Sequence, residues 1–323
     1  MKHYSVLQSE ILETFKGLGS FENPILVDCT LGYGGHSIHL LNAYPHLRIE
    51  SFDRDTQAIN LVKARLTQEG ITKERIHFHP TPFSQALPSL SPQTLSEVKG
   101  IVADLGVSSM QLDEEERGFG FHSSSLDMRM DTQQNLNAAK ILNTYSPSAL
   151  EEIFRNYGEF RESKKLTNLI AERRKKKPFD SCLELSSFIE QHFKNHRIHP
   201  ATLAFQALRI EVNNELGELQ GLLDSILWAY NAGYLQGARV GIISFHSLED
   251  RLIKQAFKLW SKSCICPQEN YKCECGNNHQ KGYVVTKKPI VPNSNEIAQN
   301  KRARSAKLRI FEFMPSKLSN SSM

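Results

Sequence analysis

The stretch that decides the fold is Ile25-Leu-Val-Asp28-Cys-Thr-Leu-Gly32-Tyr-Gly34-Gly35-His36. It opens with a short apolar run that ends in an acid and is followed by glycines. This pattern is typical of a buried parallel strand that enters a tight turn. Glycines at such a turn let the backbone approach a ligand closely. Because residues 36–44 are predicted to be helical, the stretch indicates a strand, a ligand-binding turn and a helix.

The same pattern returns along the chain. Residues 48–53 and 100–104 are predicted strands that also end in Asp, residues 75–79 predict another strand, and residues 56–69 have helical spacing. Strands that alternate with helices predict the α/β class, with a parallel sheet covered on both faces.

The alternation stops near residue 112. Residues 137–195 carry helical patterns and no convincing strand, and apolar residues from Phe205 to Leu223 recur at spacings of three and four, which predicts one long helix. Residues 238–244 then predict a strand that returns to the sheet. We therefore expect a discontinuous α/β domain over residues 1–112 and 215–323, interrupted by a helical insertion over residues 113–214.

Two acids at strand ends are candidate ligand-binding residues. Asp53 lies 19 residues after Gly34, near the roughly 20 residues expected for a carboxylate that binds ribose hydroxyls. The alternative for Asp53 is to cap the following helix, a role that Asp55 could equally fill. Asp104 ends another strand, at the edge where open parallel sheets bind ligands.

A second polar cluster, Ser244-Phe-His246-Ser-Leu-Glu249-Asp250-Arg251, follows the strand predicted over residues 238–244. A hydrolase triad is disfavoured, because the chain has no G-x-S-x-G turn and these residues are consecutive rather than convergent. We interpret the cluster as one that orients a base or the adjacent loop.

The net charge of the chain is only +4, but basic residues are concentrated in two short runs. Such basic runs suit the binding of nucleic-acid phosphates, although a solvated helix end is the alternative for each. No window approaches the roughly 18 apolar residues of a membrane span, which leads us to expect a cytoplasmic protein. The basic residues concerned are Arg173, Arg174, Lys175 and Lys176 in one run and Arg302 and Arg304 in another.

Four of the six cysteines crowd into twelve residues, as Cys264-Ile-Cys266 and Cys273-Glu-Cys275. Four thiolates can close a tetrahedral site around a structural zinc ion. Each pair, however, is separated by one residue instead of the usual two to four, so a loop of free thiols is the alternative.

Taken together, segments along nearly the whole chain resemble the MraW/RsmH family of methyltransferases. They are Thr30-Leu-Gly-Tyr-Gly-Gly-His-Ser37, Asp104-Leu-Gly-Val-Ser-Ser109, Gln111-Leu-Asp113, Glu116-Arg-Gly-Phe119, Leu126-Asp-Met-Arg-Met-Asp131, Asn156-Tyr-Gly-Glu159, His199-Pro-Ala-Thr202, Phe205-Gln-Ala-Leu-Arg-Ile210, Ser244 to Arg251, and Arg302 to Arg309.

The resemblance implies a Rossmann-like, S-adenosylmethionine-dependent methyltransferase sheet with an inserted helical domain. The implied activity is methylation of the exocyclic N4 amine of a cytidine in 16S ribosomal RNA, within the small ribosomal subunit. By motif match, the cofactor would be held by Gly34, Gly35, His36, Asp53, Phe83, Asp104 and Gln111.

Chemistry adds candidate roles around that reaction. A cytosine amine is a weak nucleophile, so an acceptor for its proton is expected, and Asp104 is the first candidate. His246 and Asn213 are candidates for holding the base, while Arg129 and Arg209 are candidates for binding phosphate or stacking on a base.

Two other classes remain open at this point. A dinucleotide-dependent oxidoreductase would use the same kind of sheet, although the G-x-G-x-x-G pattern is missing because Ser37 fills its last position. A non-catalytic RNA-binding assembly factor would share the basic runs.

Overall fold

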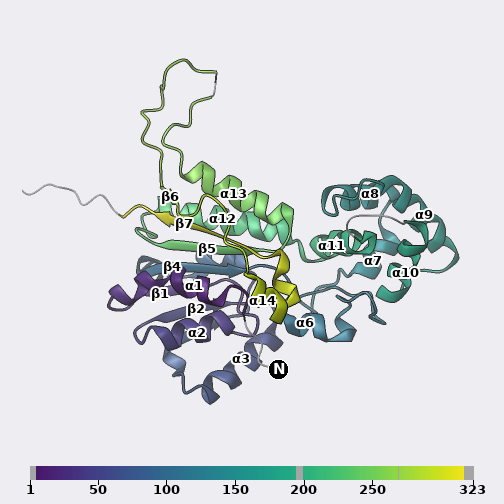
Figure 1. The fold of residues 1–323 in the computed structure, drawn as a ribbon, viewed down its shortest axis with the longest axis horizontal. Coiled ribbons are helices and arrows are strands. Elements are labelled where there is room, and N and C mark those ends of the chain that lie inside the picture. Colours follow the sequence, from purple (N-terminus) through teal and green to yellow (C-terminus); the bar gives the residue numbers. More distant parts are fainter. Residues whose placement is uncertain (1–4, 194–198, 268, 316–323) are drawn as a thin grey trace, which may run out of the picture. The chain divides into compact units, whose positions relative to one another are not determined.

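A computed structural model describes residues 5–193, 199–267 and 269–315. The chain divides into two compact units (Figure 1). The first joins Met1–Gly106 to Glu218–Met323, and the second is Val107–Gly217. The sequence pattern places these unit boundaries at 112/113 and 214/215 instead.

A seven-stranded sheet organises the described part of the first unit, in the order β3-β2-β1-β4-β5-β7-β6. The five strands from β3 to β5 are parallel, and β7 joins β5 in antiparallel register. The predicted α/β class and its five parallel strands are confirmed, whereas β6 and β7 were not predicted. The strands are β1 (Ile25–Asp28), β2 (Arg48–Phe52), β3 (Ile76–His79), β4 (Val98–Asp104), β5 (Arg239–Ser244), β6 (Gly282–Val284) and β7 (Lys307–Phe313).

Helices cover both faces of this sheet (Figure 1). One face packs against apolar side chains such as Ile38 of α2 and Val62 of α3. The other packs against Leu222 of α12 and Phe257 of α13. The helices of this unit are α1 (Gln8–Thr14), α2 (Gly35–Ala43), α3 (Thr56–Gln68), α4 (Ala86–Ser89), α5 (Pro92–Glu97), α12 (Glu215–Asn231, which begins at the unit boundary), α13 (Ser247–Trp260) and α14 (Ser294–Gln299).

The second unit is helical, and its described residues contain no strand. Its own core includes Phe154, Leu166, Leu185 and Leu208, one from each of four helices. No helix in the described parts of the chain is long and apolar enough to cross a membrane. The helices of this unit are α6 (Ser109–Asp113), α7 (Ala138–Thr144), α8 (Pro147–Asn156), α9 (Ser163–Lys176), α10 (Cys182–His192) and α11 (Pro200–Asn213).

The single long helix predicted from Phe205 to Leu223 is wrong. The helix is interrupted at Asn214, whose left-handed φ of 50° ends α11 before α12 begins. Asparagine tolerates this conformation better than most residues, because its short side chain can form local hydrogen bonds. The apolar spacing continues across the break, so periodicity alone did not reveal it.

Candidate cofactor site

The candidate site lies where the strand order of the first unit reverses. β1 lies between β2 and β4 in the sheet. The chain leaves β1 toward β2 but leaves β4 toward β5, so the connections that follow these two neighbouring strands run in opposite directions. Ligands of open α/β sheets bind at the carboxyl ends of the strands at such a reversal. Asp28 ends β1 and Asp104 ends β4, which brings two acids to this edge.

The turn after β1 requires glycine at position 34 and is tight at position 35. Gly34 has a φ of +70°, and a Cβ there would lie 2.7 Å from Cγ1 of Val62. A Cβ on Gly35, the first residue of α2, would lie 1.9 Å from Oγ of Ser5. The predicted glycine turn therefore follows a tight path, in which a side chain at residue 34 has no room and one at residue 35 would require the Ser5 side chain to rotate away.

Asp28 and Thr30 hold this turn together from within. The Asp28 carboxylate accepts a hydrogen bond from the Ser37 hydroxyl at 2.6 Å and from the Thr30 N–H at 3.1 Å. Its burial raises its pKa above the ordinary aspartate value. The Thr30 hydroxyl accepts the backbone N–H of Asp104 at 2.6 Å and so connects the ends of β1 and β4. None of the three polar side chains was predicted as a site residue from the sequence, although an acid at a strand end followed by Thr was a usable indication.

Asp53 follows β2 and shapes the same loop. One carboxylate oxygen accepts the Gly32 N–H at 2.9 Å, and the other accepts the Asp55 N–H at 2.9 Å. Burial raises the pKa of Asp53 to about 6, although both backbone bonds favour the ionised form. Each oxygen keeps a further lone pair that can accept a ligand hydroxyl. Asp55 caps α3 by accepting the Gln57 N–H, which leaves Asp53 available for the other role.

His36 and Asp104 face each other across the strand ends. His36 Nε2 lies 3.4 Å from Asp104 Oδ2, and the imidazole side chain is only 7% exposed. Among the residues that the structure describes, neither ring nitrogen of His36 nor Oδ1 of Asp104 has a hydrogen-bond partner. Buried polar atoms are nearly always paired in folded proteins, so these three atoms are available to the polar groups of a ligand or to water.

The other two predicted cofactor residues are placed differently. Phe83 begins a short 3-10 turn in the first unit and is partly buried against its core. Gln111 belongs to the second unit, where its side chain accepts the Ser108 N–H at 3.1 Å and completes a capping box on α6. Its contact with a cofactor stays a prediction.

The two predicted base-holding residues have structural contacts of their own. His246, in the first unit, caps α13 through Nδ1, and its Nε2 lies 3.3 Å from a Glu249 carboxylate oxygen. Asn213, in the second unit, is buried and forms a clip with a neighbouring loop. Its amide accepts the Met130 N–H and donates to the Met128 carbonyl, each at 2.7 Å.

The predicted RNA-binding arginines of the second unit also contact protein groups. Arg129 forms two 2.8 Å bonds with Asp127, and Arg209 forms bonds of 2.7 and 2.9 Å with Glu215. Arg174 donates to two backbone carbonyls at the end of α7.

Among the remaining predicted basic residues, Arg173 is half-buried and the others are exposed. Arg173 pairs with Glu184, while the exposed Lys175 pairs with Glu172. Lys176 is also exposed, as are Arg302 and Arg304 in the first unit.

The four cysteines predicted as metal ligands lie together in the first unit, between α13 and β6 and apart in sequence from the strand-end loops.

The chain resembles known proteins over nearly its whole length. The family model described as the MraW methylase family matches residues 1–314. A Helicobacter hepaticus protein named ribosomal RNA small subunit methyltransferase H is 62% identical over 98% of this chain and 99% of the relative. Proteins of the same name from Wolinella succinogenes and Helicobacter pylori are 50% and 49% identical, and each match covers at least 96% of this chain and 98% of the relative.

Proposed function

The chain belongs to the MraW methylase family, and from this premise we propose that it transfers a methyl group from S-adenosylmethionine to the N4 amine of a cytidine in the decoding region of small-subunit (16S) ribosomal RNA. The observation that carries the proposal is the group of unpartnered buried atoms on His36 and Asp104, at the strand ends where such a cofactor would bind. The relatives' name supplies the class of RNA, and the sequence resemblance supplies the amine.

The residues present fit S-adenosylmethionine. When bound, this cofactor supplies a methyl group that is activated by attachment to a sulfonium. The turn at Gly34 and Gly35 admits a ligand close to the backbone, and Asp53 presents carboxylate oxygens suited to ribose hydroxyls. Phe83 supplies an aromatic face for the adenine, and the role of Gln111 rests on the family resemblance alone. The family and this fit favour methyl transfer over a dinucleotide-dependent oxidoreductase.

Asp104 is the group that we assign to the target amine. The lone pair of a cytosine amine is delocalised into the ring, and a carboxylate that accepts an amine hydrogen returns electron density to the nitrogen. Asp104 has an oxygen without a protein partner, and its backbone is fixed by Thr30. Holding the amine in position supplies much of the remaining rate enhancement. His246 and Asn213 stay second candidates for holding the base, because the His246 ring and the Asn213 amide already have structural contacts.

We assign RNA recognition to the helical unit and its basic residues, with Arg302 and Arg304 contributing from the first unit. The exposed Lys175 and Lys176 at the end of α9 are better placed for phosphate than Arg174, which donates to backbone carbonyls. Binding to small ribosomal subunits is therefore expected to weaken steeply as salt rises, because each phosphate contact releases counterions. Binding that is insensitive to salt would contradict this assignment.

The test is methylation of small ribosomal subunits from cells that lack the modification. Purified protein and methyl-labelled S-adenosylmethionine are added, the RNA is digested to nucleosides, and mass spectrometry identifies the labelled product. We expect N4-methylcytidine with the unmodified chain and little with Asp104→Asn, which keeps the size of the side chain and removes its charge. Binding of S-adenosylhomocysteine is measured on both proteins.

The outcomes separate the parts of the proposal. Loss of methylation with retained S-adenosylhomocysteine binding supports Asp104 as the group that acts on the amine. Loss of both assigns Asp104 to the cofactor alone. A different labelled nucleoside would refute the N4 amine, and failure of the unmodified chain to bind S-adenosylhomocysteine would refute the proposal as a whole. The zinc ion predicted at the four cysteines is a separate proposal, which concerns a loop and not the reaction.

A further inference from the structure

The segment between α13 and β6 leaves the first unit as a long excursion (Figure 1). Its two ends are joined by backbone bonds, from the His279 N–H to the Ser263 carbonyl at 3.0 Å and from the Lys281 N–H to the Trp260 carbonyl at 2.8 Å. None of the described residues between 261 and 281 is buried, and Tyr271 is fully exposed. The excursion therefore has no apolar core of its own to hold its shape.

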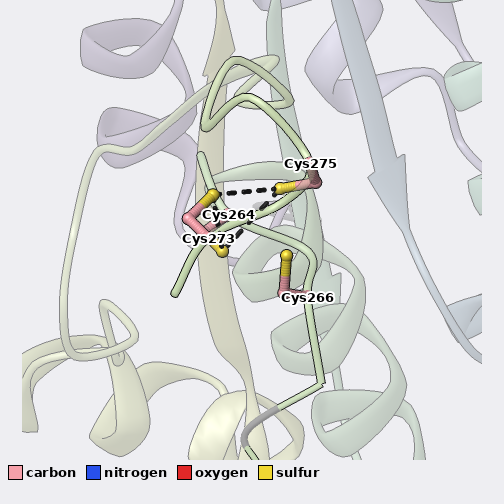
Figure 2. Close-up of side chains that lie close together, drawn as sticks. All are labelled: Cys264, Cys266, Cys273 and Cys275. Carbon is pink, nitrogen blue, oxygen red and sulfur yellow. Dashed lines mark hydrogen bonds between the residues drawn. The ribbon is translucent and has the colours of Figure 1, made fainter. Parts of the chain in front are cut away.

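Four sulfur atoms meet inside this excursion (Figure 2). The Cys264 and Cys273 Sγ atoms are 3.6 Å apart, Cys273 and Cys275 are 3.5 Å apart, and Cys264 and Cys275 are 3.8 Å apart. Cys266 completes the group, and all four sulfurs lie within 4.8 Å of one another.

These distances match the edges of a coordination tetrahedron. Zinc–thiolate bonds of about 2.3 Å in a tetrahedral site place the sulfurs about 3.8 Å from one another. We propose that Cys264, Cys266, Cys273 and Cys275 bind a single zinc ion that holds the excursion in its folded form. The site would be structural, because four protein ligands leave no open position for a substrate.

The backbone around the sulfurs supports thiolate ligands. The Ile265 N–H, between the first two cysteines, points to Cys275 Sγ at 3.4 Å. The Glu274 N–H, between the last two, points to Cys266 Sγ at 3.3 Å. Each cysteine pair thus receives a hydrogen bond from the residue inside the other pair, and such bonds are stronger when the acceptor is charged.

His279 is not needed as a ligand. Its Nε2 lies 2.8 Å from the Cys275 carbonyl oxygen, so it ties the end of the excursion to the cysteine cluster. This contact resembles the outer hydrogen bonds that orient the ligands of metal sites.

Disulfides and larger metal clusters fit the arrangement less well. A disulfide requires sulfurs about 2.05 Å apart in a definite pair, whereas three sulfurs here are nearly equidistant and select no pair. A cluster of several iron atoms would need room between the sulfurs for its own atoms. The distances correspond to the coordination sphere of one ion.

The experiment measures the metal content of the full chain and the protease sensitivity of the excursion, with protein purified under reducing conditions without chelator. We expect about one zinc per chain by elemental mass spectrometry, and slow alkylation of the four cysteines until a chelator is added. Cobalt substitution should give the absorption bands of a tetrahedral thiolate site. Limited proteolysis should cut within residues 261–281 only after the metal is removed, because the excursion has little else to order it.

The test variant is the double substitution Cys273→Ser with Cys275→Ser. Its control is Lys272→Ser, which changes an exposed neighbour that is not a ligand. The double variant should lose the zinc and become sensitive to protease in the excursion, while the control keeps both properties. Circular dichroism checks that the rest of the chain stays folded in each. Iron in place of zinc, no stoichiometric metal, or equal zinc content in the double variant would overturn the proposal.

Discussion

Gly34→Ala is expected to be among the most damaging small changes in the first unit. The residue has a φ of +70°, which costs a residue with a side chain about 1–2 kcal/mol. The added methyl would lie 2.7 Å from Cγ1 and 3.1 Å from Cγ2 of the buried Val62. Overpacking of this kind costs about 1–3 kcal/mol. We therefore expect the free energy of unfolding to fall by about 2–5 kcal/mol.

Gly70 provides a matched control for the backbone part of this cost. It has the same φ of +70°, but a Cβ there meets no atom within 4 Å. Gly70→Ala should therefore cost only about 1–2 kcal/mol. The difference between the two variants isolates the contact with Val62, and Gly34→Ala should therefore cost less in a Val62→Ala background than in the parent.

Urea-induced unfolding, followed by circular dichroism, measures these free energies, and calorimetry with S-adenosylhomocysteine measures binding. Binding should weaken in Gly34→Ala, whose methyl displaces the turn against α3, and stay unchanged in Gly70→Ala. Equal destabilisation by the two alanines, or an equal cost of Gly34→Ala in the parent and in the Val62→Ala background, would refute the packing argument.

Three further expectations follow from contacts at the same sheet. Thr30→Val removes the acceptor for the Asp104 N–H and should cost about 1–3 kcal/mol in urea unfolding, whereas Thr30→Ser should stay near the parent; equal stability of the two would contradict the bond. Because burial raises the pKa of Asp53 to about 6, its carboxylate is protonated below that pH, and S-adenosylhomocysteine affinity should fall up to about tenfold from pH 6 to 5. Asp53→Asn should bind weakly at every pH, and an unchanged pH profile in that variant would remove Asp53 from the ribose site. Burial would raise the pKa of Glu50, but hydrogen bonds from His79 and His77 outweigh it and lower the pKa overall. That contribution to stability is present above the ordinary glutamate pKa and is lost as pH falls through the lowered value. Glu50→Gln should therefore destabilise the chain at pH 7 and differ less from the parent in acid. Thermal unfolding over a pH series measures this difference.

Among the parallel strands, β1, β4 and β5 were predictable because each contains a short continuous apolar run, and β2 was predictable because Asp53 follows it directly. It did not predict β7, because Lys307–Phe313 begins within a basic segment that was interpreted as a phosphate-binding patch. Pairing of β7 with β5 joins residues about 70 positions apart, such as Arg239 and Glu312, and local patterns carry no information on such a partner. The same limit applied at Asn214, where a backbone conformation and not a change in spacing ends the helix.

The glycines and acids of the candidate site were predictable from the sequence, but the structural role of each polar side chain was not. Spacing left Asp53 and Asp55 equivalent, and only the fold shows that Asp55 caps α3. Asn213 was predicted to hold a base, yet the fold uses its amide to clip residues 128–130. A polar side chain in a sequence does not show which backbone groups it will have to satisfy once buried.

Asp104 illustrates how a strand-end residue can be anchored through one group while another group stays available to a ligand. Its N–H is committed to the Thr30 hydroxyl, while its carboxylate faces His36 and keeps one oxygen without a protein partner. The anchoring N–H and the available carboxylate oxygen therefore belong to different atoms of one residue, and different substitutions change them separately. Thr30→Val displaces the strand end without changing the charge at the site, so it should weaken cofactor binding and methylation together. Asp104→Asn removes the charge and leaves the anchor in place, so it should reduce methylation far more than binding if the carboxylate acts on the amine. Equal losses in that variant would mean that Asp104 serves the cofactor only, and the acceptor of the amine proton would then have to come from another residue or from water.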